Sequence, residues 1–122
     1  MAANPVIREL KLETEKKSSE TTVRATGRIT LATTAALENT LRELILEGQR
    51  IVLDLTNVDY IDSAGLGALV SVYMHAIRAK CALDIANPKD RIRDLFNRSG
   101  LSSVFRGDSF DMLWEAWSRG GS

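Results

Sequence analysis

Two stretches near the start of the chain alternate between apolar and polar residues. Residues 10–13 read Leu-Lys-Leu-Glu, and a second alternating stretch covers residues 23–30. A period of two is typical of a β-strand with one buried and one solvated face. The polar run over residues 16–19 lies between the two stretches and predicts a hairpin turn.

The apolar spacing then changes to that of a helix. Its stripe consists of Leu37, Leu41, Leu44 and Ile45. Thr33 or Thr34 is expected to cap the start of this helix, and Gly48 stands where a C-terminal glycine is expected. Residues 51–55 form a short apolar run with little alternation, which predicts a strand covered on both faces, as in a parallel sheet.

A loop is expected over residues 56–62, followed by a helix over residues 63–80. The apolar positions of that helix are Leu66, Leu69, Val70, Tyr73, Met74 and Ile77. A strand over residues 81–86 comes next, with Cys81 as a small core residue. Asn87 and Pro88 then predict the start of a helix that ends at Gly100. The stripe of this helix consists of Ile92, Leu95 and Phe96.

The last part of the chain predicts a short strand near residues 103–105 and a final helix. The stripe of the final helix consists of Phe110, Leu113, Trp114 and Trp117. Strands that alternate with helices indicate an α/β fold, here a mixed, mostly parallel sheet of about four or five strands with about four helices packed on it. We expect one domain over residues 1–122, ordered over about residues 5–117, with a flexible tail at 118–122. Functional groups of such sheets gather beyond the C-terminal strand ends, here at residues 56–63.

Composition narrows the classes of protein. The chain has 122 residues, of which 44% are hydrophobic, and this suffices for one core. Sixteen Lys and Arg balance sixteen Asp and Glu, which argues against a nucleic-acid binder. One cysteine and one histidine exclude an internal disulfide framework and a metal site that needs two histidines. No signal-peptide pattern and no run long enough to span a bilayer are present, so a cytoplasmic protein without membrane insertion is expected.

Most of the candidate chemistry lies in residues 59–67, Asp-Tyr-Ile-Asp-Ser-Ala-Gly-Leu-Gly. Ser63 is expected at the N-cap of a helix, where free N–H groups and the helix dipole favour negative charge. Ordinary capping explains a serine at this position. The alternative is a modifiable hydroxyl, because phosphorylation would add about −1.5 to −2 charges that a helix N-terminus tolerates. Residues 51–77 contain Asp54, Asp59 and Asp62 but no Lys or Arg, so acidity gathers around this serine.

Glycines follow Ser63 in the first turns of the expected helix. Gly65 and Gly67 each cost a helix about 1 kcal/mol relative to alanine. One explanation is close packing of the helix on the sheet. The other is that small residues leave Ser63 accessible to a partner's active site.

Catalysis by the chain itself is not predicted. His75 lies about three helical turns beyond Ser63, or about 18 Å along the axis, while a general base must lie within about 3 Å of its target. Gly65, Gly67 and Asp84 weakly resemble a dinucleotide fingerprint, but Val70 occupies the third glycine position. A small nucleotide-binding enzyme is therefore kept only as a third hypothesis, and neither catalytic residues nor a cofactor or metal site is predicted.

The run Ile-Val-Leu-Asp-Leu-Thr-Asn-Val-Asp-Tyr-Ile-Asp-Ser-Ala-Gly-Leu-Gly-Ala-Leu over residues 51–69 resembles the signature of STAS domains, most of all that of bacterial anti-sigma-factor antagonists. Residues 25–29 and 87–101 resemble the second strand and the third helix of that family. The resemblance implies a regulator that is not an enzyme. In the family, the serine matching Ser63 is phosphorylated by a GHKL-type kinase that is also the anti-sigma factor. The unmodified antagonist binds this kinase and frees a sigma factor, and a PP2C-type phosphatase restores binding.

The resemblance also implies a surface that contacts the partner. It consists of Thr30, Asp59, Tyr60, Asp62, Ser63, Ala64, Gly65, Leu66 and Gly67. Thr30 departs from the family, which often has aspartate after the second strand. This departure motivates an alternative, a STAS adaptor or scaffold subunit of a stressosome or transporter complex. Formation of a homodimer is left open by the sequence.

Overall fold

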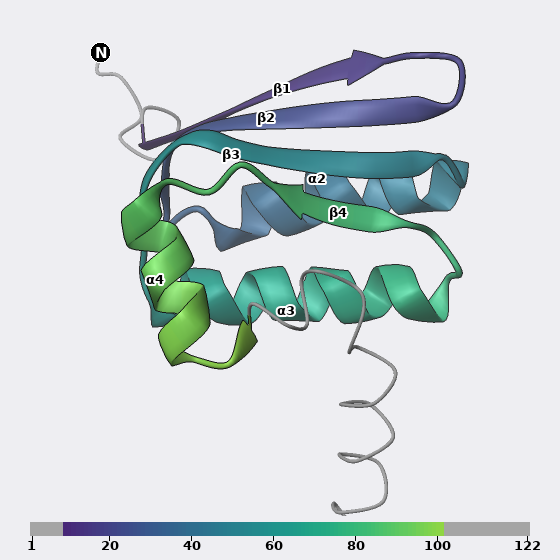
Figure 1. The fold of residues 1–122 in the computed structure, drawn as a ribbon. Coiled ribbons are helices and arrows are strands. Elements are labelled where there is room, and N and C mark those ends of the chain that lie inside the picture. The colour runs from purple at the N-terminus through teal and green to yellow at the C-terminus, as the bar shows by residue number, and fades with distance from the viewer. Residues whose placement is uncertain (1–8, 102–122) are drawn as a thin grey trace, which may run out of the picture.

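The two alternating segments form a hairpin in the computed structural model, which describes residues 9–101. Strand β1 (Leu10–Lys16) pairs antiparallel with β2 (Glu20–Ile29). The N–H of Lys17 donates to the carbonyl of Glu20 at 2.8 Å and closes the predicted turn (Figure 1). The inward-facing side chains of β2, such as Val23 and Ile29, are fully buried.

Helices and strands alternate after the hairpin. The elements are α2 (Thr34–Glu47), β3 (Arg50–Ile61), α3 (Ser63–Arg78), β4 (Leu83–Ala86) and α4 (Asp90–Arg98). The sheet has the order β1-β2-β3-β4, with β3 parallel to both β2 and β4. The predicted α/β fold with a mixed, mostly parallel sheet is therefore confirmed. The strand, helix and tail expected after residue 101 lie outside the described residues.

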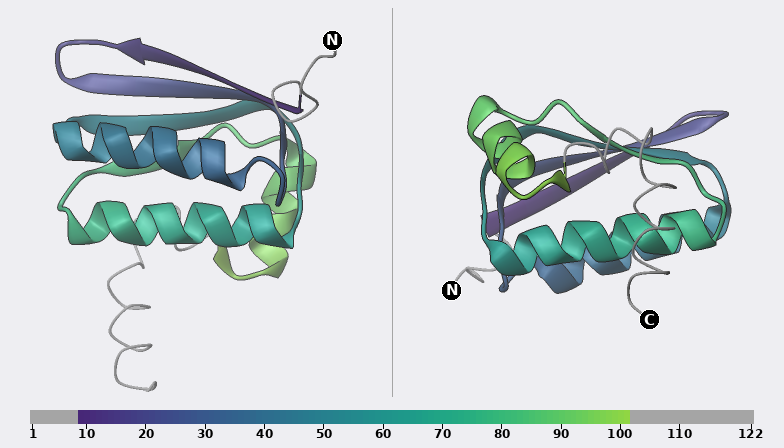
Figure 2. Two further views of the ribbon diagram at one scale, coloured as in Figure 1. Left: turned by 180° about the vertical axis from the view of Figure 1, so that it is seen from behind. Right: turned by 60° about the horizontal axis from the view of Figure 1, so that its bottom comes forward.

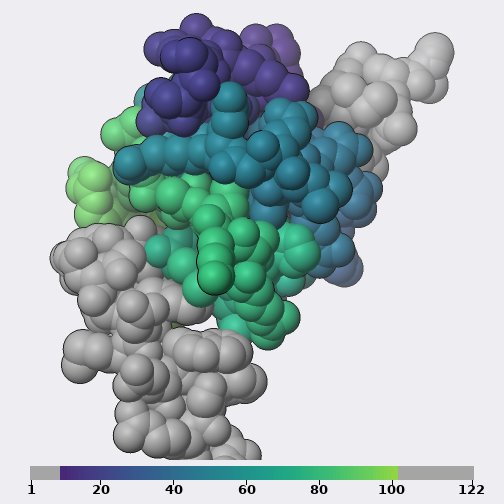
Figure 3. Space-filling model, turned by 90° about the vertical axis from the view of Figure 1, so that its right-hand side faces the viewer, coloured from purple at the N-terminus to yellow at the C-terminus, as the bar shows by residue number. Residues whose placement is uncertain are grey.

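Helices α2 and α3 lie side by side against one face of the sheet (Figures 1 and 2). Figure 3 views the molecule from the end at which both helices terminate, with the β1–β2 hairpin above them. The opposite face of the sheet is polar and carries ion pairs across the strands, such as Arg24 with Glu15 at 3.6 Å and with Asp54 at 3.8 Å. The prediction that residues 51–55 are covered on both faces is therefore wrong within the described part, because Val52 and Asp54 lie half-buried on this polar face.

Strand β3 continues through the segment that was expected to be a loop. Residues 56–61 remain paired with β2, with Tyr60 opposite Arg28 and Ile61 opposite Ile29. Two register shifts place extra residues in β3, so its later buried positions are spaced by three: Leu55, Val58 and Ile61. A bulge breaks the period-two pattern by which a strand is recognised. The loop prediction is wrong for this reason.

The predicted start of α2 is confirmed in its position but not in its capping hydrogen bond, and the predicted start of α4 is wrong by two residues. Thr33 stands at the N-cap of α2, but its hydroxyl makes no cap hydrogen bond; it accepts from the Thr30 N–H at 2.9 Å and donates to the Arg28 carbonyl at 3.0 Å. Helix α4 has Lys89 at its N-cap instead of Asn87, whose backbone is left-handed with φ of 58°. The predicted helix ends are confirmed, since Gly48 is the left-handed C-cap of α2 and Gly100 follows α4.

Helix α3 packs on the sheet through small residues as well as large ones. Its buried face consists of Gly65, Ala68, Leu69, Val72, Tyr73 and Ala76. Leu66, Val70 and Met74 of the predicted stripe are only partly buried at the edge of this face, and Ile77 is exposed. Small residues allow a close approach of helix and sheet, so hydrophobicity alone pointed to the wrong centre of the buried face. Cys81 is buried as predicted, but β4 begins two residues later.

Candidate functional site

Ser63 lies at the junction where β3 ends and α3 begins. It is the first residue of α3, and the N-cap is Asp62, whose carboxylate accepts a hydrogen bond from the Gly65 N–H at 2.7 Å. The prediction that Ser63 itself occupies the N-cap is therefore wrong by one residue. Because Asp62 takes the capping role, the Ser63 hydroxyl has no hydrogen-bond partner among residues 9–101, and the residue is exposed.

Asp62 also ties α3 to the turn that follows β2. Its second carboxylate oxygen accepts from the Leu31 N–H at 3.2 Å, and its own N–H donates to the Ile29 carbonyl at 3.1 Å. These bonds bring Thr30 and Leu31 to the same end of the sheet as Ser63. Thr30 is half-buried, whereas Leu31 is 75% exposed.

The two glycines near Ser63 have different surroundings. A Cβ at Gly65 would lie 2.2 Å from the backbone oxygen of Ile29, so close packing explains this glycine. A Cβ at Gly67 would meet nothing within 4 Å, and Gly67 is exposed. Packing within the described residues therefore does not explain Gly67.

Asp59 and Tyr60 belong to β3 instead of a free loop. Asp59 forms an ion pair with Lys89, which precedes α4, and the hydrogen bond and charge of Lys89 lower the pKa of Asp59 below its ordinary value. Tyr60 is 42% exposed, and the guanidinium of Arg28 lies 4.8 Å from the centre of its ring. The acidic field expected around Ser63 is therefore partly neutralised by Lys89.

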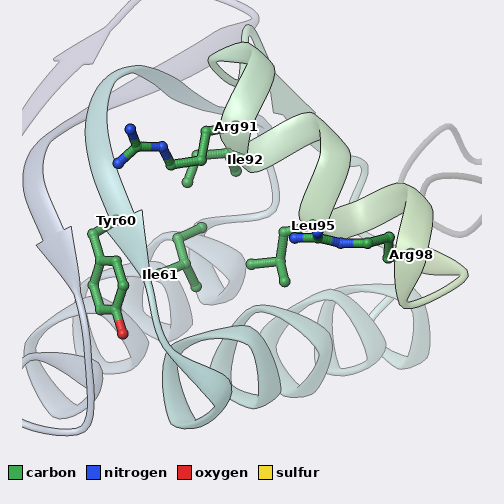
Figure 4. Close-up of a pocket in the computed structure, with 6 residues that line it drawn as sticks. All are labelled: Tyr60, Ile61, Arg91, Ile92, Leu95 and Arg98. Atoms are coloured by element: carbon green, nitrogen blue, oxygen red, sulfur yellow. The ribbon is translucent and has the colours of Figure 1, made fainter.

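A small hollow lies next to these residues, between the end of β3 and α4 (Figure 4). Its volume is about 210 Å³, and it is lined by Tyr60, Ile61, Arg91, Ile92, Leu95 and Arg98. Sequence reasoning identified Tyr60 as a candidate but not the hollow, because its two walls are about 30 residues apart in the chain.

The structure gathers the predicted partner surface at one end of the sheet. Residues 59–67 run through the end of β3 into α3, and Thr30 joins them through the turn after β2. Ala64 and Leu66 are partly buried, so they offer less surface than Ser63 and Gly67. Leu31 was not among the residues predicted for this surface. Its sequence pattern could have suggested it, because Leu31 is an apolar residue that belongs to neither the preceding strand pattern nor the stripe of the following helix.

The other candidate chemistries find no support in the described residues. Asp84 lies opposite Val52 in the sheet and forms an ion pair with Arg50. Gly65 instead contacts the C-terminal end of β2 at Ile29. Asp84 and the glycine pair therefore do not form a nucleotide site. Residues 9–101 contain no group of three His, Cys, Asp or Glu side chains that could hold a metal ion. Within the same range, every helix is too short or too polar to cross a membrane.

One family model and several named proteins are similar in sequence to this chain. The family model described as "Mlab, STAS domain" matches residues 12–107. The putative anti-sigma factor antagonist BtrV of Bordetella bronchiseptica is 34% identical over 80 residues, which cover 65% of this chain and 69% of that protein. The anti-sigma-B factor antagonist of Staphylococcus aureus is 32% identical over 96 residues, which cover 78% of this chain and 89% of that protein.

Solved structures share the fold at lower identity. An anti-sigma factor antagonist from Mycobacterium paratuberculosis superposes with a TM-score of 0.66 at 22% identity, covering 79% of this chain and 82% of that chain. The phosphorylated form of the Bacillus cell fate determinant SpoIIAA gives a TM-score of 0.60 at 19% identity, covering 77% of this chain and 86% of that chain.

Proposed function

The chain belongs to the STAS domain family, and from this premise we propose that it is an anti-sigma factor antagonist switched by phosphorylation of Ser63. In its unmodified state it binds an anti-sigma factor that is also a serine kinase of the GHKL type, and so frees a sigma factor. A phosphate on Ser63 ends this binding, and a PP2C-type phosphatase restores it. The chain performs no catalysis in this scheme, and it acts in the cytoplasm, where its partners work.

The observation that carries the proposal is the exposed Ser63 hydroxyl beside a cap made by another residue. Asp62 supplies the oxygen that binds the Gly65 N–H, so Ser63 is not required for capping. A kinase can therefore bind and phosphorylate the Ser63 hydroxyl without first breaking a hydrogen bond within residues 9–101. Gly67, one turn further along α3, adds no side chain that would obstruct the approach.

The charge of a phosphate acts on docking more than on the fold. The first N–H groups of a helix have no partner within the helix, and its dipole stabilises an anion there. The carboxylates nearby are already engaged, Asp59 with Lys89 and Asp62 with two backbone N–H groups. A phosphate would add about −1.5 to −2 charges to a surface that faces the partner, and a partner fitted to the neutral serine would then bind more weakly.

Phosphate transfer tests the proposal directly. The full chain is incubated with ATP and the GHKL-type anti-sigma factor from the same genome, and the modified residue is mapped by mass spectrometry. We expect phosphate on Ser63, none on the Ser63→Ala variant, and undiminished modification of the Ser71→Ala variant, which lacks another exposed serine of α3. Modification that persists in Ser63→Ala would show that a different residue carries the switch.

A second candidate is a STAS adaptor subunit of a stressosome or transporter complex. One observation favours it: Thr30 stands where kinase-regulated antagonists often have aspartate. Thr30 presents a half-buried hydroxyl in the turn before α2 instead of a carboxylate. Stable co-purification of the full chain with a transporter ATPase, without binding to a kinase, would favour this candidate over the first.

A further inference from the structure

The hollow between β3 and α4 has an apolar floor and a basic rim. Ile61 and Ile92 of its floor are 5% and 2% exposed, and Leu95 is half-buried beside them. Figure 4 shows the Arg91 side chain extending from α4 toward Tyr60, and the Arg98 side chain lying beside Leu95. An apolar surface flanked by guanidinium groups suits a ligand that carries both an apolar group and negative charge.

The two arginines of the rim form no direct contact with a carboxylate of the described chain, although the charge of Arg91 acts at longer range on Asp59 and helps to lower its pKa. Within residues 9–101, neither Arg91 nor Arg98 lies within ion-pair distance of an acidic side chain. The neighbouring cations differ, because Lys89 is paired with Asp59 and Arg93 with Asp90 at 3.2 Å. Arg91 and Arg98 therefore offer positive charge at the mouth of the hollow.

The size of the hollow limits what can enter it. Its volume of about 210 Å³ is below the range of about 300–1,000 Å³ that is usual for sites of small molecules and cofactors. One large apolar side chain fills such a space, in the manner of an anchor residue at a protein interface. Tyr60 forms one wall of the hollow and also belongs to the partner surface that was predicted around Ser63, so the hollow adjoins that predicted surface.

We propose that this hollow is the docking point for an acidic segment of the partner protein, with a phenylalanine or leucine side chain in the hollow and flanking carboxylates paired with Arg91 and Arg98. The inference rests on the proposed function only in taking the partner to be the protein that also contacts Ser63.

A peptide titration tests the hollow without any anti-sigma factor. The full chain, labelled with ¹³C at isoleucine and leucine methyl groups, is titrated by NMR with the peptide acetyl-Glu-Asp-Phe-Asp-Glu-amide. We expect saturable shifts of the Ile61, Ile92 and Leu95 methyl signals. A peptide with lysine in place of its four acidic residues, and one with alanine in place of phenylalanine, are expected to give shifts about tenfold weaker or none.

Variants of the same helix separate the rim from general charge. The double variant Arg91→Ala/Arg98→Ala is expected to bind the acidic peptide about tenfold more weakly. Arg93→Ala, which removes another exposed cation of α4 that does not line the hollow, is expected to change binding by less than about twofold. The proposal is overturned if no methyl signal shifts at millimolar peptide, or if the lysine peptide binds as tightly as the acidic one. It is also overturned if residues 108–117 of the chain itself contact the Ile92 methyl groups in the unbound protein, because the hollow would then be filled by the chain. None of these results depends on whether Ser63 is phosphorylated, so the two proposals can fail separately.

Discussion

The carboxylate of Asp62 accepts a hydrogen bond from the Leu31 N–H at 3.2 Å, although the two residues are 31 positions apart in the chain. Its other oxygen accepts from the Gly65 N–H at 2.7 Å. One side chain thus joins the turn after β2 to the first turn of α3. Leu31 and Ser63 are exposed on either side of this junction. Asp62 holds them in one surface, and both of its carboxylate oxygens are used in hydrogen bonds to the backbone.

Removal of the Asp62 carboxylate should therefore destabilise the fold. We expect Asp62→Ala to lower the free energy of unfolding by about 1–2 kcal/mol, the usual cost of losing an N-cap, and Asp62→Asn to cost less because its amide oxygen can still accept from the Gly65 N–H. Urea unfolding of the full chain measures both. Asp90→Ala, which removes a carboxylate that is 96% exposed, is the control. A loss for Asp62→Ala no larger than for this control would show that the bridge contributes nothing.

The two glycines of α3 should respond in opposite directions to the same substitution. Gly65→Ala is expected to destabilise the protein by about 1–3 kcal/mol, because the new methyl group would overlap the Ile29 carbonyl. Gly67→Ala is expected to stabilise it by about 0.5–1 kcal/mol, because alanine is the better helix former and meets nothing there. Thermal or urea unfolding distinguishes the two, and destabilisation by Gly67→Ala would contradict the open surroundings of that residue.

Gly67 also offers a test of access to Ser63. If the absence of a side chain at Gly67 serves the partner, the more stable Gly67→Ala variant should be phosphorylated more slowly by the anti-sigma factor kinase. Its replacement by a larger residue, Gly67→Leu, should slow the reaction further. Rates equal to that of the unmodified chain would leave the glycine without a role in access.

Leu31 should contribute to partner binding and little to stability. Leu31 is 75% exposed, so Leu31→Ser should change the free energy of unfolding by less than about 0.5 kcal/mol. Its position beside Asp62 predicts weaker binding of the anti-sigma factor, by about tenfold if the leucine is an anchor of the interface. Leu46→Ser is the matched control, because Leu46 is 85% exposed near the end of α2, away from the junction. Calorimetry that shows the same loss for both variants would refute a specific role.

The free energy of unfolding should fall at acid pH because Asp54 becomes protonated. Partial burial acts to raise the pKa of Asp54, but the hydrogen bonds from Thr56 and Asn87 and the charge of Arg24 outweigh it and lower the pKa below the ordinary 3.8. A lowered pKa in the folded state means that ionisation stabilises the fold. This stability is present above the unfolded pKa and is lost as the pH falls through the folded pKa.

The measurement is the free energy of unfolding from about pH 2 to pH 6. We expect a decline below the ordinary pKa of 3.8 in the unmodified chain and a smaller decline in Asp54→Asn. Asp59, whose pKa Lys89 lowers, should act in the same direction, so Asp54→Asn/Asp59→Asn should be flatter still. An identical acid slope in the three proteins would exclude these carboxylates as its source.

The order of strands and helices follows from the sequence because each element shows its own period. The alternation before Ile29 and the stripe of α2 depend only on neighbouring residues, and so does the change of period that predicts parallel crossovers. The position of Ser63 at a strand–helix junction is of the same local kind. The predicted N-cap of α3 was wrong by one residue, because Asp62 and Ser63 are both good N-cap residues and the local sequence does not distinguish between them.

The tertiary structure decided the features that depend on partners about 30 residues away. The bulges that carry β3 on to Ile61 form against β2, and they erase the period that would have identified a strand. The choice of Asp62 as the cap is tied to Leu31, and the ion pair of Asp59 depends on Lys89. The sequence by itself therefore determined which residues are apolar, in which order strands and helices follow one another, and which serine is conspicuous. The chain crossovers decided which side chains meet, because hydrogen bonds and packing act through space and leave no period in the sequence.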